Sequence, residues 1–504
     1  MNRSVQFTFG IIVIVAIFTY PLLRAGWTGM RLIKITDQTI ESGRAYAQNI
    51  FSTNGEEQDQ QAEQLRTDLN KLEQLLFKFN RQTSESWIAQ KIMSDKQKIQ
   101  INLAPDLITI AQKILTGKQT YVLLFQNSEE LRATGGFLGS YAKIKLNDGK
   151  LIDFEIEDIY VPDGQFGWFI EAPAGAKEYL SGGDGLRLRD ANWHPDFPTS
   201  AQQILTYLAW GKEAGIDGAI AVNLPVVEKV LSSTGPIFLH DYEQTVTENN
   251  FSDIARSDRD EFFPGSVQKQ HFLATFFNQL LIKLQELSPR DQHLLAEKII
   301  TSVIEKDLQF FSNNQTLQSL FEKLNISGQM IQVENAAYLM LVESNVGINK
   351  ANQHIDRAVN LKIEDDYDLV EITFVNRNLP PNSKKKNPNE SNHLGYVNYQ
   401  RILLSPEVKV EEILFDNQKI TSWDEEIISN SKGVKFKQVG FLLTLPERET
   451  KKLLIKLDSL VTDQRSTIFI QKQAGLSLVP YHFSYYNHNL SLDLIKDALV
   501  NLDN

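Results

Sequence analysis

The sequence predicts a central α/β domain that follows an N-terminal transmembrane helix with a helical stalk and precedes a C-terminal antiparallel β-sandwich. Three observations support this fold class. An uncharged apolar run stands near the N-terminus, segments with strand and helix periods alternate in the middle, and period-two alternation begins at residue 358. We expect a cytoplasmic tail and membrane anchor at 1–32, a helical stalk at 33–119, a three-layer α/β domain at 120–343, and a linker with a β-sandwich at 344–504.

The composition narrows the possible function classes. The net charge of −12 argues against general nucleic-acid binding, which requires a basic face. The absence of cysteine excludes disulfides and thiolate metal sites. A hydrophobic content of 42% is that of an ordinary globular protein. We therefore expect a folded protein that does not use nucleic acid as a partner.

The apolar run Val5–Leu23 predicts a membrane anchor. It contains no charged residue, and its 19 residues are close to the length that spans a bilayer. No small-x-small cleavage site follows promptly, and Trp27 has the character of an interfacial anchor, so we favour an uncleaved anchor over a cleaved signal peptide. The positive-inside rule leaves the orientation open, because Arg3 and the amino terminus oppose Arg24, Arg31 and Lys34.

The region 33–119 is polar and favours helices. Its leucines recur at helical spacing, and Asn54-Gly55 interrupts the pattern, which predicts at least two helices. We favour a stalk that lifts the main domain off the membrane over a dimerising coiled coil, because heptads are not sustained. The leucines are Leu65, Leu69, Leu72, Leu75 and Leu76.

The α/β region opens with three expected strands. The first is a short apolar run with aromatic and β-branched residues, and an Asn-Asp-Gly turn typical of a hairpin joins the next two. The polar loop 126–136 carries Arg132, two carboxylates and the pair Gly135-Gly136 at the end of the first strand. Open α/β sheets bind ligands at such strand ends. The expected strands are 121–125, 137–146 and 151–160.

A long segment, 161–198, shows no convincing periodicity and is rich in Gly and Pro. Its many aromatic residues argue against disorder, so we expect an ordered lid or binding loop. Beyond it the pattern again alternates between helix and strand. We expect helices at 199–210, 226–231 and 266–287, a buried strand at 219–222, and further helices within 289–343.

From residue 358 the apolar residues alternate with polar ones, with turns between the alternating stretches. This pattern is typical of an antiparallel β-sandwich. Residues 345–360 are the expected connector, and the polar insert 378–392 is an expected exposed loop. The expected strands lie near 359–363, 369–375, 399–404, 434–445, 452–457 and 466–471.

Arginines and carboxylates dominate the possible chemistry. No GxxxxGK[ST], HExxH, GxSxG or GxGxxG pattern occurs, and the eight histidines are scattered. Guanidinium groups bind phosphate oxygens bidentately and carboxylates hold Mg²⁺, so a phosphorylated ligand fits, as do ordinary surface ion pairs. The candidates are Arg132, Arg189, Arg256, Arg259, Lys269 and Gln270 for substrate binding, and Asp158 and Asp190 for catalysis and Mg²⁺.

Three of these features have a structural alternative. Arg132 is equally suited to a salt bridge with Glu129 or Glu130. The glycine pair that follows Arg132 permits a tight turn, with or without a ligand. Trp193 and His194 suit either stacking on a sugar or packing of the long loop that contains them.

Longer motifs resemble a known family. The segment "LFQNSEELRATGGFLGS", residues 124–140, looks like the hallmark of a bacterial membrane-anchored family, the domain of unknown function 4012. Its further motifs resemble residues 190–201, 217–222, 234–236 and 343–350, so the likeness runs from about 120 to 360. The resemblance implies an extracytoplasmic domain on a cell-membrane anchor and supplies no established activity.

A second resemblance is to the LytR-CpsA-Psr family, whose members transfer glycopolymers from a polyprenyl-pyrophosphate carrier to peptidoglycan. The segments 215–237 and 255–281 are similar to that family's strand–helix segment and its arginine-rich segment with the following helix. By this likeness Arg256 and Arg259 hold the pyrophosphate and Gln270 matches a helix glutamine, whereas Lys269 replaces an arginine. Asp158 matches the Pro-Arg-Asp motif loosely, without its arginine.

The expected function is that of a single-pass membrane protein whose extracytoplasmic domain binds or transfers a polyprenyl-pyrophosphate-linked glycopolymer with Mg²⁺. The alternative is a non-catalytic envelope scaffold or adhesin that binds protein or glycan. In that case the charged residues are structural ion pairs.

Overall fold

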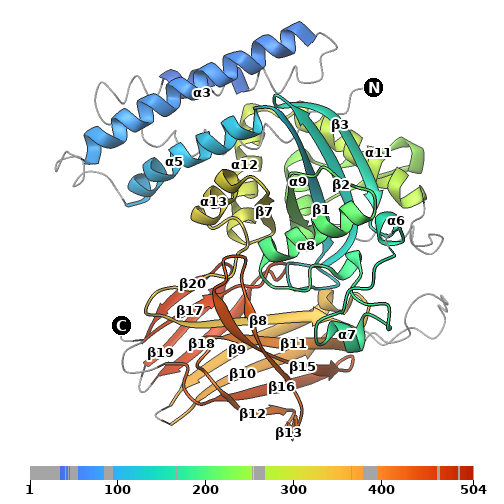
Figure 1. The fold of residues 1–504 in the computed structure, drawn as a ribbon, viewed down its shortest axis with the longest axis vertical. Helices are drawn as coiled ribbons and strands as arrows, with labels where there is room; N and C mark the ends of the chain where they lie inside the picture. Colours follow the sequence, from blue (N-terminus) through green and yellow to red (C-terminus); the bar gives the residue numbers. More distant parts are fainter. Residues whose placement is uncertain are drawn as a thin grey trace.

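The structure is a computed structural model that describes residues 55–84 and 95–502, with part of 34–45 and with gaps at 166, 252–253, 255–266, 365, 379–394, 462–465 and 486–487. The predicted anchor and most of the predicted insert 378–392 lie outside these residues. Within the described part, no helix is both long and apolar enough to span a membrane. Figure 1 shows helices at one end, an α/β domain in the middle and a β-rich region at the other end.

A five-stranded mixed sheet forms the centre of the α/β domain. Its strand order is β3-β2-β1-β4-β7, with β1 parallel to β4 and the other neighbours antiparallel. The four strands expected from the sequence are confirmed, whereas β7 lies where only helices were expected. The strands are β1 (Lys118–Asn127), β2 (Phe137–Asn147), β3 (Lys150–Asp158), β4 (Gly218–Asn223) and β7 (Leu308–Ser312).

Helices cover both faces of this sheet, because successive strand residues point to opposite sides. Val122 and Leu124 pack towards α8 (Phe197–Trp210). Leu123 and Phe125 pack on the other face towards α9 and α11, together with the small hairpin β5–β6. Helix α12 packs on α9, and α13 covers the same face near β7. The bounds are α9 (Leu224–Thr234), α11 (Val267–Gln285), α12 (Pro289–Ile304), α13 (Gln315–Lys323), β5 (Ile237–Leu239) and β6 (Gln244–Val246).

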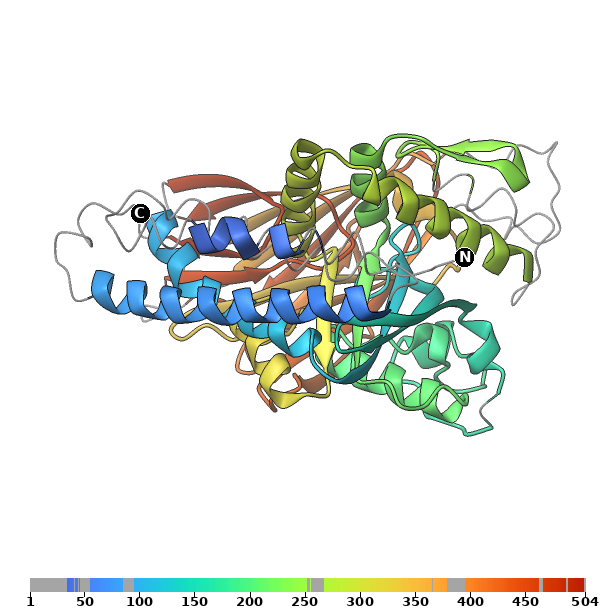
Figure 2. The same cartoon turned by 90° about the horizontal axis from the view of Figure 1, so that it is seen from above.

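The helices expected within residues 33–119 are present, and the two long ones lie against the α/β domain. Helices α3 (Gly55–Ser84) and α5 (Asp95–Ile114) pack side by side across the end of this domain (Figures 1 and 2). Ile110 and Ile114 of α5 join a cluster with residues of β1 and β2. Arg66 of α3 donates to the backbone carbonyls of Leu115 and Asp148. Their apolar faces are therefore used in the fold and do not form an isolated stalk.

The segment 161–198 is not a free lid. It contains α6 (Tyr160–Asp163), α7 (Ala176–Tyr179) and the 3₁₀ turn η2 (Leu188–Asp190). Leu188, Trp193 and Phe197 are buried in the same cluster as β1 and α8. The expectation of an ordered segment is confirmed; Leu188, Trp193 and Phe197 are core residues, whereas Trp168, Phe169 and Tyr179 are exposed.

Two packed sheets form the C-terminal region. A seven-stranded sheet has the order β13-β12-β16-β10-β9-β18-β19, and a six-stranded sheet has the order β14-β15-β11-β8-β17-β20. The six expected strands coincide with β9, β10, β11, β15, β16 and β17. The strands are β8 (Ala337–Asn345), β9 (Ile355–Ile363), β10 (Asp368–Asn376), β11 (Tyr396–Leu404), β12 (Val410–Phe415), β13 (Gln418–Lys419), β14 (Asp424–Ser429), β15 (Lys435–Leu445), β16 (Thr450–Leu457), β17 (Thr467–Gln471), β18 (Val479–Tyr485), β19 (His488–Leu494) and β20 (Ala498–Asn501).

The sequence pattern did not predict strand β8, because both faces of this strand are buried. Ala337 and Leu339 point into the core between the two sheets, whereas Tyr338, Met340 and Val342 pack towards the α/β domain. A strand buried on both sides reads as a continuous apolar run without alternation. The six-stranded sheet thus begins before the predicted boundary at 344, and it lies between the seven-stranded sheet and the α/β domain.

Candidate functional site

The loop between β1 and β2 leaves the carboxyl end of β1 and turns towards the C-terminal sheets. Its two glycines are required by close backbone contacts. A Cβ atom on Gly136 would lie 2.3 Å from the backbone of Asn127, and one on Gly135, which has φ +133°, would lie 2.3 Å from the Asn223 side chain. The glycine pair therefore allows tight packing, the structural alternative in the sequence interpretation.

The side chain of Arg132 is buried inside the protein. Only 1% of its side chain is exposed, and its Nη2 lies 3.2 Å from Glu130 Oε1 and 3.3 Å from Asp190 Oδ1. Nη1 donates to the carbonyl oxygen of Asn345 at 2.7 Å, and Nε donates to Asp190. All three nitrogens are thus used by protein acceptors. This geometry favours the ion-pair alternative for Arg132 over phosphate binding.

The two predicted catalytic carboxylates do not converge on a metal site. Asp190 is paired with Arg132 and lies 3.7 Å from Arg189 Nε, and Arg189 also binds Asp163 at 2.5 Å. Asp158, at the end of β3, accepts a hydrogen bond from the backbone of Tyr160. The described residues contain no group of three or more His, Asp or Glu side chains placed to hold a metal ion. Their Mg²⁺ role therefore has no support in this geometry.

A second set of contacts fixes residues 190–196 to the six-stranded sheet. The guanidinium of Arg401 on β11 lies 4.5 Å from the centre of the Trp193 ring and donates to the Trp193 carbonyl oxygen at 2.9 Å. Asp196 caps α8 and also accepts from the backbone N–H groups of Met330 and Ser431. Trp193 is 3% exposed, so it packs against the six-stranded sheet and does not present a face to a sugar.

Burial changes the pKa values of His194, Asp196 and Arg401. Burial lowers the pKa of His194 from 6.5 to about 4, and the positive charge of Arg401 acts in the same direction. Burial also raises the pKa of Asp196, against the effect of its hydrogen bonds. Arg401 has no carboxylate within ion-pair distance among the described residues, and burial lowers its pKa to about 10. These groups are held in place at a cost in solvation, as is typical of a rigid structural core.

The expected connector after residue 344 is also part of this junction. Asn345 donates its backbone N–H to the carbonyl oxygen of Leu131, and its side chain binds Asn349 and Asn352. Gln473 donates to the carbonyl oxygens of Arg132 and Glu343 and accepts from the Glu343 N–H. We call these buried contacts around Arg132, Asp190, Asp196, Asn345, Arg401 and Gln473 the junction.

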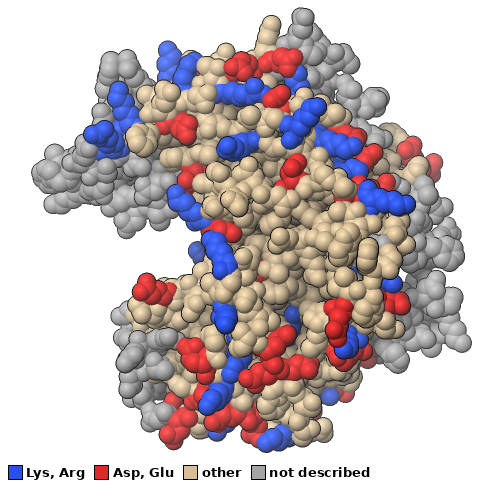
Figure 3. Space-filling view, in the orientation of Figure 1, with Lys and Arg blue, Asp and Glu red and all other residues tan. Residues whose placement is uncertain are grey.

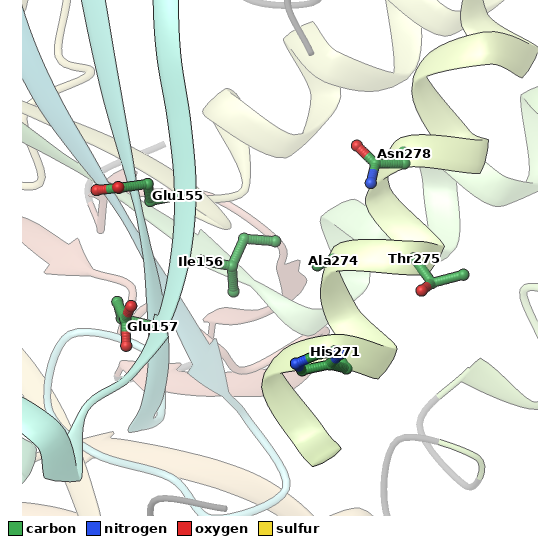
Figure 4. A pocket seen from close by; sticks show the side chains of 7 residues that line it. All are labelled: Glu155, Ile156, Glu157, His271, Ala274, Thr275 and Asn278. Carbon is green, nitrogen blue, oxygen red and sulfur yellow. The ribbon is translucent and has the colours of Figure 1, made fainter. Parts of the chain in front are cut away.

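A cleft of about 380 Å³ lies elsewhere, between the edge strand β3 and helix α11. Figure 4 shows that Ile156 points towards α11, whereas Glu155 and Glu157 point away from it. The helix contributes His271, Ala274, Thr275 and Asn278. The predicted substrate residues Arg256 and Arg259 lie outside the described residues. Lys269 and Gln270 lie in the first turn of α11, and their side chains are not described.

Comparison with known proteins identifies part of the chain. Residues 116–259 match the model of a family described as protein of unknown function (DUF4012). The match confirms the predicted likeness to this family over residues 116–259, which we call the DUF4012 segment, and does not extend over the rest of the predicted range to 360. No curated protein matches the chain. A crystal structure of a "putative nutrient binding protein" from Legionella pneumophila is similar at 8% identity and a TM-score of 0.19, over 26% of this chain and 50% of that chain, and this likeness carries no conclusion. The LytR-CpsA-Psr resemblance gains no support from these matches.

The DUF4012 segment supplies one side of the junction, and the C-terminal region supplies the other. Glu130, Arg132, Asp190 and Asp196 come from the segment, as the motif analysis predicted. The C-terminal residues of the junction, Arg401, which binds Trp193, and Gln473, which binds the Arg132 backbone, were not predicted. A buried arginine inside the apolar stretch 399–404 was a possible signal, because an arginine in a core strand needs a partner.

Proposed function

We propose that this protein is a membrane-anchored, extracytoplasmic cell-envelope protein that binds glycan without transferring it. The observation that carries the non-catalytic part is the burial of Arg132, which is 1% exposed and bound to Glu130, Asp190 and Asn345. A phosphate would have to displace two carboxylates and a carbonyl oxygen to reach this guanidinium. Removing such partners from a buried charge is strongly unfavourable.

The rest of the junction supports a rigid platform. Asp196 joins α8 to two segments outside the DUF4012 segment, and Gln473 bridges the loop of Arg132 to β8. Buried hydrogen bonds of this kind favour one relative arrangement of the parts they connect. A rigid platform suits recognition of an extended ligand, because little ordering is needed on binding.

Binding to isolated bacterial sacculi tests this proposal. We expect the full-length chain, purified in a detergent without a sugar headgroup, to co-sediment with sacculi and to release no modified glycan during prolonged incubation with Mg²⁺. Protease added to intact spheroplasts should degrade the described domains, which tests the extracytoplasmic location. Failure to co-sediment, or protection from the protease, would refute the proposal.

Transfer of a polyprenyl-pyrophosphate-linked glycopolymer is the second candidate. The cleft between β3 and α11 favours it, because Lys269 and Gln270 begin the same helix. Native mass spectrometry with a polyprenyl pyrophosphate tests this role. A bound adduct that disappears in the Arg256→Ala/Arg259→Ala variant would support it, whereas an adduct that persists would remove these arginines from the site.

A further inference from the structure

Three large aromatic side chains lie exposed on the segment between α6 and α7 and at the end of α8. Trp168 is 67% exposed, Phe169 is 68% exposed and Trp210 is 38% exposed. We call these three residues the aromatic surface. Single exposed apolar residues are common, but neighbouring exposed tryptophans mark binding surfaces. The sequence analysis counted Trp168 and Phe169 among the aromatic residues that predict an ordered lid or binding loop, and it assigned no role to Trp210.

The rings are held in position before any ligand arrives. Trp210 stacks on Tyr207, with ring centres 5.4 Å apart and an angle of 20° between the ring planes. Tyr207 is only 2% exposed and accepts a hydrogen bond from Gln203. Trp168 lies 6.4 Å from Trp210 at an angle of 41°. The two indoles therefore form a bent platform on a buried base.

The backbone that carries Trp168 and Phe169 is clamped on both sides. A Cβ atom on Gly211 would lie 2.6 Å from Pro162 of α6, so α6 packs tightly on the end of α8. Leu186 donates its N–H to the carbonyl oxygen of Ile170 at 2.8 Å. The described residues on either side of position 166 are therefore held in place, so ordering them on binding costs little entropy.

The charges near the aromatic surface argue against an anionic ligand. On the same segments, Glu171, Glu178 and Asp184 are exposed, against Lys177 and Lys212. Figure 3 shows a broad uncharged area in the middle of the face where Figure 1 places α8. A densely anionic phospholipid surface would meet a weakly acidic rim. The sugar rings of a glycan strand carry no charge of their own, so stacking on them avoids this repulsion.

We propose that the aromatic surface binds the sugar rings of a glycan strand, with Trp168 and Trp210 stacking on neighbouring sugars. This inference rests on the proposed function and names the binding surface. The C–H bonds on one side of a pyranose ring carry partial positive charge and meet the negative face of an indole. Two tilted indoles suit two successive sugars of a twisted strand.

Sacculus binding by tryptophan variants tests this inference in the full-length chain. We expect Trp168→Ala and Trp210→Ala each to weaken binding at least about tenfold, as truncation of a central aromatic anchor does. A soluble β1,4-linked N-acetylglucosamine hexamer should compete with sacculi for the wild-type chain. The control is Phe77→Ala, because Phe77 on α3 is 71% exposed and lies outside the aromatic surface. Its binding should equal that of the wild type.

The outcomes separate the inference from the proposed function. If the wild type binds sacculi and both tryptophan variants bind equally well, the inference fails and the proposed function stands. If the wild type does not bind at all, the proposed function fails. Trp168→Tyr should restore most of the binding, which separates ring stacking from a folding defect. Vesicles of anionic phospholipid that bind through the same tryptophans more tightly than sacculi would overturn the inference in favour of membrane docking.

Discussion

The junction and the aromatic surface invert the usual distribution of charged and apolar side chains. At the junction, charged side chains are buried and Arg132 is paired with Glu130 and Asp190, whereas at the aromatic surface large rings face solvent. Charged residues are rarely buried unless paired, and neighbouring exposed tryptophans are unusual without a ligand. The comparison teaches that the charged motif residues of the DUF4012 segment hold the fold together. Residues that bind a ligand are better sought outside these motifs, at the aromatic surface.

Loss of Arg132 should have the largest effect on stability. Arg132→Met leaves Glu130 and Asp190 buried without their common partner, and breaking a buried pair in this way costs about 3–5 kcal/mol. Urea denaturation of the full-length chain measures the change. The matched control is Arg377→Met, because Arg377 is 65% exposed and pairs with an exposed Asp356. Equal stability of the two variants would show that the junction is not structural.

A close glycine contact at the junction provides the second test. Gly475 has φ +80°, and a Cβ atom there would lie 2.0 Å from the carbonyl oxygen of Gly135. Gly475→Ala should therefore destabilise the protein by roughly 2–5 kcal/mol, from backbone strain plus overpacking. Gly433→Ala is the control, because Gly433 has the same φ and no atom within 4 Å of the added carbon. If the two substitutions cost the same, the parts are not in close contact at this point.

The period of the sequence predicted the elements that have one buried face. Strands β9, β10 and β16 alternate because one side of each faces the core between the sheets. Strand β8 carries no alternation because both faces are buried, and β7 is too short to distinguish from a helix turn. The sequence thus indicates which residues are apolar, but not how many layers cover them.

The sequence predicted which types of residue form the candidate site, but not the contacts between them. Arg132 and Asp190 were both selected, but their pairing joins residues 58 positions apart, and the bond to Asn345 spans 213 positions. Spacing within a single sequence contains no signal for such contacts. The exposure of Trp168 was equally hidden, because the neighbouring aromatic residues Trp193 and Phe197 have the same character and are buried.

The pH dependence of His194 should give the smallest effect and the sharpest test of burial at the junction. Its pKa is lowered from 6.5 to about 4, so the unfolded chain binds a proton that the folded chain does not as the pH falls through this window. The contribution of the neutral His194 ring to the stability of the folded protein is complete above pH 6.5 and is lost towards pH 4. Between pH 7 and pH 5 the loss is at most about 2 kcal/mol, and it is smaller to the extent that water reaches the ring.

His194→Asn keeps an acceptor for the Asp196 N–H, which now bonds to His194 Nδ1 at 3.1 Å, and removes the titrating ring. Asp196 has a raised pKa and gives a slope of opposite sign, but it is present in both proteins, so the difference between them isolates His194. Urea denaturation at pH 7, 6 and 5 should show a shallower loss of stability in the variant. His482→Asn, on an exposed ring of β18, is the control and should follow the wild type. Identical pH profiles for wild type and His194→Asn would mean that water reaches the ring freely, and that the contrast between a buried junction and an exposed aromatic surface does not hold at His194.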